Sequence, residues 1–459
     1  MFRNLLYLSL IVLIGCGKGE KSSSNVFFAG EIVNPTSNYV VLHKGDMVID
    51  SAKLDEQNRF AFHLDSVAEG LHHFNHDPEL QYVYLEKGDS LMIRLNTLYF
   101  DESLVFSGIG EEINNFLLEL FLTNEEEAVT IRTFYRLEAE EFVEKIDSLK
   151  QMKLLTLANL KTEGSLSEKE EKVARASVVY NYDTYKEEYP FRHKKSKGKN
   201  AIEKLPDDFY NYRKDLTFND KDLTYLRPYY NFMINHVGNL SYMTCSHACG
   251  IQNNVVRNQL HFNKHKLNLI DSLVEEKELK DNLFRYVAFD YLLKHDSEKN
   301  NENFIKGFHE LSSNNRHMEE IDALYEGVKN IQPNKTIPNV DVFGFDGNKI
   351  SMREIAKDHK TVFYFWSGTD RMHFENIKRR IAKLTIEKPE FSYVGINVKT
   401  DIDNWKALLE NSGLDANKQY RSSNFEELTK TLIVYPLNKC IITENEVIVD
   451  AFANVYGSF

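Results

Sequence analysis

The spacing of the apolar residues changes twice along this chain, and this limits the folds that the sequence can adopt more than any other feature. Between residues 26 and about 107, short runs alternate apolar and polar side chains, with turn residues such as Asn, Gly and Asp between them. A period of two is typical of strands with one buried face, so we expect an antiparallel β-sandwich over residues 26–110. Over residues 111–330 the apolar positions recur three and four apart, which predicts a helical region.

Strands and helices alternate in the remaining part of the chain. Residues 331–338 contain two prolines and are predicted to be a linker. After it we expect a domain over residues 339–459, with strands at 340–345, 362–366, 393–397, 439–443 and 447–451 and helices at 350–356, 370–384 and 405–411. Alternation of this kind predicts an α/β domain with a parallel-centred sheet. The whole chain is therefore predicted to be a multidomain α+β protein.

Residues 339–459 resemble the membrane-tethered thioredoxin-like reductases. The resemblance rests on the order of the predicted elements, on Phe365 and Trp366 before the helix turn, and on Tyr435 and Pro436 before the last hairpin. It implies a thioredoxin-like fold, in which a nucleophilic thiolate and a resolving thiol stand at the start of a helix. Here Asp370 and His373 occupy those positions. The domain is therefore predicted to be redox-inactive.

Two functions remain open for the residues around this helix start. Asp370 is expected to cap the helix, because a carboxylate there accepts hydrogen bonds from free N–H groups. Alternatively, Asp370 and His373 form an acid–base pair that faces one cleft. The resemblance also implies a cis peptide bond before Pro436, beside which an extended peptide can pair. Trp366, Tyr435 and Pro436 are therefore candidate residues of a peptide groove, unless Tyr435 and Pro436 only shape a turn.

The cysteines outside the first sixteen residues are few. Cys245 and Cys249 lie four positions apart, with His236 and His247 nearby. Packed thiols, a disulfide, and a metal or redox site of Cys245, His247 and Cys249 all remain open, although a structural zinc site needs four ligands. Cys440 is expected to be buried in a strand, where a free cysteine behaves as a small hydrophobe.

A histidine-rich stretch, His72, His73 and His76, invites comparison with a metal site. In a strand His72 and His73 point to opposite faces, so at most one of them can join His76. We expect a strand end and a turn here. The sequence predicts no cofactor.

The first residues are typical of an export signal. Arg3 precedes an apolar run at 5–14, which is too short to span a bilayer. Residues 13–16 resemble the lipobox of bacterial lipoproteins, which implies a signal peptide at 1–15 and lipidation of Cys16. An ordinary secretory signal and a plain membrane anchor are the alternatives. Residues 16–25 are then a tether, and Gly17 in place of Asp favours the outer membrane, on its periplasmic or its surface face.

The β-region itself resembles the small domain of unknown function that precedes thioredoxin-like domains in many exported lipoproteins. The matching residues lie at 50–54, 60–62, 84–90, 106–108 and 114–117. This resemblance implies no activity.

The charge excludes one class of partner. The net charge is −13, and nucleic-acid binding needs clustered Lys and Arg. The basic run at 192–199 is expected to be a solvated loop. We therefore expect a lipid-anchored cell-envelope protein that binds a protein partner or acts as a scaffold and is not an enzyme. The alternative function is a thiol–disulfide oxidoreductase or isomerase that uses Cys245 and Cys249.

Overall fold

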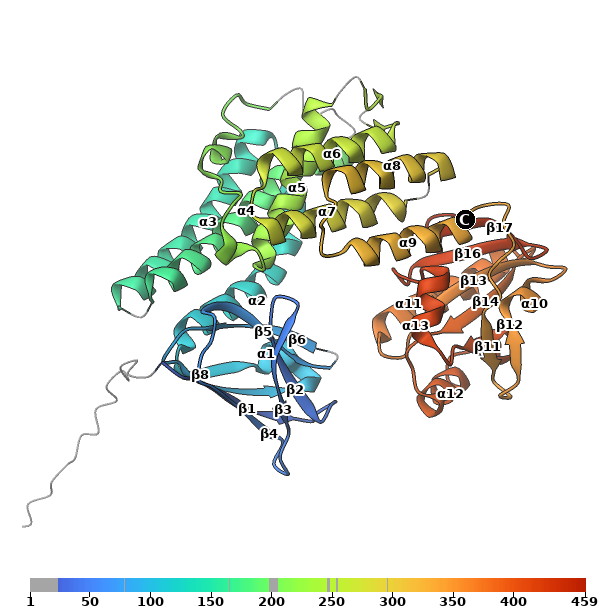
Figure 1. Ribbon diagram of the computed structural model, residues 1–459, viewed down its shortest axis with the longest axis horizontal. Coiled ribbons are helices and arrows are strands. Elements are labelled where there is room, and N and C mark those ends of the chain that lie inside the picture. The colour runs from blue at the N-terminus through green and yellow to red at the C-terminus, as the bar shows by residue number, and fades with distance from the viewer. Residues whose placement is uncertain are drawn as a thin grey trace, which may run out of the picture. The chain divides into compact units, whose positions relative to one another are not determined.

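The computed structural model describes residues 24–459, except 78, 165, 198–204, 246–247, 253–254 and 295. It confirms a multidomain α+β protein (Figure 1). The chain divides into two compact units, one ending at His236 and one beginning at Val237. The predicted signal peptide, Cys16 and most of the tether lie outside the described residues. Within the described residues, every helix is too short or too polar to cross a bilayer.

The first unit begins with the predicted β-sandwich. Its two sheets have the strand orders β4-β1-β7-β8 and β3-β2-β5-β6. The strands are β1 (Val26–Val33), β2 (Tyr39–Lys44), β3 (Met47–Lys53), β4 (Arg59–Leu64), β5 (Gly70–His76), β6 (Glu79–Leu85), β7 (Ser90–Asn96) and β8 (Val105–Ile109). The sandwich is not antiparallel throughout, because β1 and β7 pair in parallel. Between these two strands the chain forms β4 and all four strands of the opposite sheet, and such a long connection allows a parallel pair.

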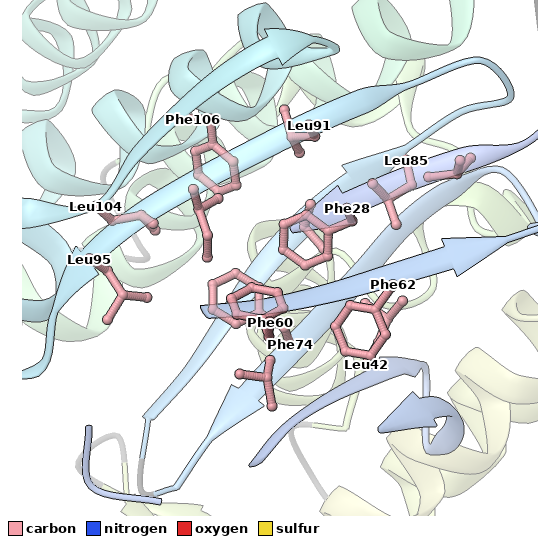
Figure 2. Close-up of a cluster of buried hydrophobic side chains, with 14 of the residues drawn as sticks. Phe28, Leu42, Phe60, Phe62, Phe74, Leu85, Leu91, Leu95, Leu104 and Phe106 are labelled. Atoms are coloured by element: carbon pink, nitrogen blue, oxygen red, sulfur yellow. The ribbon is translucent and has the colours of Figure 1, made fainter. Parts of the chain in front are cut away.

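Alternating side chains of both sheets meet between them and form the core (Figure 2). The ring of Phe28 lies 5.5 Å from Phe60 and 6.0 Å from Phe62, both on the neighbouring strand β4. It also lies 5.6 Å from Phe74 on β5 of the facing sheet. The period of two in the sequence therefore corresponds to the burial of one face of each sheet.

Long helices complete the first unit: α2 (Glu111–Phe134), α3 (Ala139–Thr162), α4 (Glu168–Lys197) and the first part of α5 (Arg227–Thr244). The expectation of a solvated loop over the basic run at 192–199 is wrong up to Lys197, because α4 contains Pro190 and continues to Lys197; residues 198 and 199 lie outside the described residues. A proline costs a helix one hydrogen bond and adds a steric clash. Packing offsets this cost, since the Tyr189 ring lies 4.3 Å from Phe142 and its hydroxyl donates to the Leu137 carbonyl at 2.8 Å.

The second unit contains the rest of α5, further helices and the C-terminal sheet. Its helices before the sheet are α6 (Gln259–Leu273), α7 (Lys277–Leu292), α8 (Glu298–Leu311) and α9 (Met318–Asn330), with a short hairpin of β9 (Ile251–Gln252) and β10 (Val255–Val256). The predicted linker at 331–338 hydrogen-bonds to the last strand. The Asn334 N–H donates to the Ile448 carbonyl at 2.9 Å, and the Ile448 N–H donates to the Lys335 carbonyl at 2.8 Å.

The C-terminal sheet has the order β12-β11-β15-β14-β13-β16-β17, in agreement with the predicted α/β domain. Its strands are β11 (Asp341–Gly344), β12 (Lys349–Ser351), β13 (Lys360–Trp366), β14 (Ser392–Asn397), β15 (Gln419–Arg421), β16 (Lys439–Glu444) and β17 (Val447–Asn454). Its helices are α10 (Met352–Ala356), α11 (Arg371–Glu387), α12 (Ile402–Glu410) and α13 (Phe425–Leu432). Strands β13, β14 and β15 are parallel, and β16 and β17 form an antiparallel hairpin.

A buried lysine joins this hairpin to α13. Lys439 is 5% exposed, and its Nζ donates to the carbonyls of Leu432 and Ile433 at 2.6 Å each. These carbonyls stand at the C-terminal end of α13, where a cation is favoured. Burial nevertheless lowers the pKa of Lys439 to about 7.

We expect Lys439 to make stability depend on pH. Between pH 7 and about 10 the unfolded chain keeps a proton that folded Lys439 has lost, so the free energy of unfolding should rise by up to about 1.4 kcal/mol per pH unit. Denaturant unfolding at pH 7, 8 and 9 should show this slope in the wild type and a smaller slope in Lys439→Met. The matched control is Lys430→Met, since the Lys430 side chain is 69% exposed. Equal slopes in all three proteins would contradict the assignment.

Candidate functional site

The start of α11 carries the two residues that stand at the predicted redox positions. Asp370 is the N-cap, and its Oδ1 accepts a hydrogen bond from the His373 N–H at 2.9 Å. The predicted cap is therefore confirmed. The His373 Nε2 donates to the Phe365 carbonyl at 3.1 Å. Each side chain is thus directed at a backbone group, and the contact between the two residues runs through the His373 N–H.

A hollow of about 430 Å³ lies beside this helix start. Its lining combines the candidate pair with Met372, Asn376, Arg379 and Tyr456. Met372 is 77% exposed, so the hollow opens to solvent next to an apolar side chain. The hollow offers the guanidinium of Arg379 and the carboxylate of Asp370, which can bind polar backbone or side-chain groups.

Only part of the predicted peptide groove lies at the surface. The peptide bond before Pro436 is cis, as the resemblance implies, and Tyr435 is 45% exposed. Trp366, in contrast, is fully buried. Its Nε1 donates to Gln419 Oε1 at 3.2 Å, and its ring stacks on Phe374 at 4.5 Å. Trp366 therefore belongs to the core and offers no surface to a peptide.

Cys440 is buried on β16, as predicted. Burial raises the pKa of its thiol to about 12. Because the thiolate is the nucleophile, this cysteine cannot replace the missing redox pair.

The other two cysteines form a disulfide, Cys245–Cys249, so the interpretation as packed free thiols is wrong. The Nδ1 of His261 lies 3.2 Å from Cys245 Sγ and 3.4 Å from Cys249 Sγ. The sequence did not point to His261, which is twelve residues beyond the second cysteine. His247 lies outside the described residues, and His236 is paired with Glu187 at 2.8 Å.

Backbone hydrogen bonds fold the loop between α5 and α6 so that the disulfide meets the start of α6. The Cys249 N–H donates to the Cys245 carbonyl at 3.3 Å, and the Asn258 N–H donates to the Cys249 carbonyl at 3.0 Å. The Asn258 side chain caps α6 by accepting from the His261 N–H at 3.0 Å. His261 is therefore held in the first turn of α6, with its ring against the two sulfurs.

This environment suits a reactive disulfide. A helix N-terminus and a nearby imidazole both stabilise a thiolate. Cys245 is 6% exposed and Cys249 is fully buried, so Cys245 is the more accessible of the two residues. His261 is exposed.

The histidines of β5 have separate partners. The stretch is the last part of β5, which ends at His76 and is followed by a turn at Asp77, as expected. The His72 Nδ1 donates to the Gly70 carbonyl at 2.9 Å, and the His76 Nε2 accepts from the Thr36 N–H at 3.1 Å. His73 stacks on His43 with ring centroids 4.7 Å apart. The three rings therefore contact other groups of the β-sandwich and do not converge on one point, as ligands of one metal ion would.

The cap of α11 leads to a test. Asp370→Ala should lower the free energy of unfolding by about 1 kcal/mol, because a free N–H group of α11 loses its acceptor. Asp370→Asn keeps a side-chain oxygen at the same place and should cost only a few tenths of a kcal/mol. Chemical denaturation of the three proteins checks this order. A loss that is equal in the two variants would show that the carboxylate charge, and not the cap, is what matters.

Comparisons with known proteins give limited information. No family model and no curated protein matches this chain. Among solved structures, a thioredoxin-like protein from Bacteroides caccae is similar over 53% of this chain and 86% of its own, at 16% identity and a TM-score of 0.32. The thioredoxin domain of a thiol-disulfide oxidoreductase from Bacteroides vulgatus is similar over 26% of this chain and 86% of its own, at 16% identity and a TM-score of 0.23. Because these values are too low to transfer an activity, we base the function on the geometry of this chain.

Proposed function

We propose that the protein is an exported thiol–disulfide oxidoreductase that reacts through Cys245–Cys249. The observation that carries this proposal is the position of His261 Nδ1, 3.2 and 3.4 Å from the two sulfurs, at the start of α6. A disulfide with an imidazole and a helix N-terminus beside it releases a stabilised thiolate when it is attacked.

The reaction follows from the exposure of the two sulfurs. A substrate thiolate attacks the Sγ of Cys245, the more accessible residue of the pair, and forms a mixed disulfide while Cys249 leaves as a thiolate. A second thiol of the substrate then attacks the substrate's own sulfur in the mixed disulfide and releases Cys245. The substrate leaves as a disulfide, and its two electrons remain on the protein as two thiols. The reverse sequence reduces a substrate disulfide.

The cellular place is part of the same proposal. Disulfides persist outside the cytosol, and the export signal at residues 1–15 with lipidation of Cys16 would put the protein in the cell envelope. An outer-membrane lipid anchor fits Gly17 after that cysteine. The partner is then a thiol-containing protein of the envelope, on the periplasmic or the surface face.

An insulin-reduction assay on the chain from residue 20, with a dithiol as reductant, tests the chemistry. We expect turnover in the wild type and loss of turnover in Cys245→Ser and Cys249→Ser, because neither variant can form the disulfide. His261→Ala should keep the pair but slow the reaction severalfold. Cys440→Ala is the thiol control and should leave the rate unchanged, since Cys440 is buried in β16. An inactive wild type, or serine variants with full activity, would remove the proposal.

A second candidate function is protein binding by the C-terminal domain without redox chemistry. It is favoured by the exposed Tyr435 before the cis bond to Pro436, and by the hollow beside Asp370 and His373. In this function the domain acts as a binding or scaffold component of the envelope.

Site-specific photocrosslinking in native membranes tests this binding. A photoreactive amino acid in place of Tyr435 should attach to a discrete partner. The same group in place of Tyr99, which is 67% exposed in the first unit, should not. Equal labelling from both positions would indicate non-specific contacts and count against a groove at Tyr435.

A further inference from the structure

We propose that the reduced form of Cys245 and Cys249, together with His261, binds one copper(I) ion. This goes beyond thiol–disulfide exchange, because it requires only that the disulfide can be reduced and not that the protein acts on a substrate.

The three donor atoms are already close together. The two sulfurs and the His261 Nδ1 all lie within 4.8 Å of one another. Two donors on one tetrahedral or trigonal d¹⁰ ion, with bonds of about 2.0 to 2.3 Å, stand about 3.5 to 3.7 Å apart. The His261 Nδ1 lies 3.2 and 3.4 Å from the two sulfurs, which is close to the separation expected between two ligands of the same ion. Only the two sulfurs need to separate, which reduction of their bond allows.

The position of His261 is fixed by the start of α6. Asn258 caps the helix through the His261 N–H, so His261 stays in the first turn. With Nδ1 directed at the sulfurs, the ring proton of a metal-bound His261 belongs on Nε2. Nδ1 then offers its lone pair to the ion.

The donor set favours copper(I) over zinc. Thiolates are soft ligands that select copper(I) and zinc, and zinc takes a water molecule as its fourth ligand where the protein supplies only three. Within the described part of the chain this group offers three donors. Copper(I) is stable with two thiolates and one imidazole. The complex has a net charge of about −1, which the N-terminus of α6 stabilises. Burial of both sulfurs also shields the ion from water.

Binding and disulfide formation exclude each other. A dithiol reductant delivers two electrons and two protons to the disulfide and itself becomes a disulfide. Copper(I) then displaces the two thiol protons, so two protons are released for each ion bound and no electron moves. Copper(I) therefore binds only when Cys245 and Cys249 are reduced, so binding depends on the redox state of this pair.

Copper(I) titration of the full chain tests the site. The protein is reduced with dithiothreitol, freed of it without oxygen, and titrated against a chromophoric copper(I) chelator. We expect one ion per chain in the reduced wild type and none in the oxidised protein. Cys245→Ser and Cys249→Ser should each lower the affinity by at least a hundredfold, and His261→Ala by about tenfold.

Matched controls separate ligands from neighbours. His265 lies one turn further along α6, and its Nδ1 lies 3.0 Å from the Ser241 hydroxyl, so His265→Ala should leave the affinity unchanged. Cys440→Ala should also leave it unchanged, because that thiol is buried in β16. His261→Ala retains both cysteines, and a cooperative unfolding transition like that of the wild type shows that it is folded.

Several outcomes would overturn the inference. These are a reduced wild type that retains no copper, equal binding by His261→Ala and the wild type, equal binding by the oxidised protein, or a strong preference for zinc when both ions compete. Copper binding without insulin reduction would remove the proposed oxidoreductase function alone. Insulin reduction without copper binding would remove this inference alone.

Discussion

The C-terminal domain depends on the burial of one strand, β13. From Thr361 to Trp366 every residue of this strand is buried, and it pairs with β14 on one side and β16 on the other. Each large apolar side chain that leaves water contributes about 1.5 to 3 kcal/mol. The strand ends at Trp366, and α11 begins five residues later at Arg371. The position of the helix start, and with it Asp370 and His373, follows from where β13 is held.

The strong apolar patterns made much of this fold predictable. The fully apolar run of β13 and the alternating residues of β4 each matched a single kind of element. The sequence did not indicate β15, because a strand of three residues is defined by its pairing with β14 and not by its own pattern. Pro190 favoured the wrong expectation of a loop after it for a related reason. Its local signal favours a break, whereas packing of Tyr189 on α3 keeps the helix intact.

The candidate sites show the same limit. The cap at Asp370 is a local property and could be predicted from its position before an apolar helix. The role of His261 could not, because it depends on a contact with Cys245, sixteen positions earlier, across the loop between α5 and α6. The candidate reactive cysteines therefore lie outside the domain with the predicted redox positions. The C-terminal α/β domain has a single buried thiol among its described residues, while the disulfide with a histidine beside it lies in the loop between two helices.

The segment at 331–338 covers the edge of β17. It forms hydrogen bonds through Asn334, Lys335 and Ile337, and a bridge between Thr336 and Val447. An uncovered outer strand presents a row of free N–H and C=O groups that invites pairing with another chain. A chain shortened to begin at residue 339 would lose this cover and expose β17 to self-association. The part of the chain that protects this edge therefore starts before residue 339 and includes Ile331, which is itself fully buried.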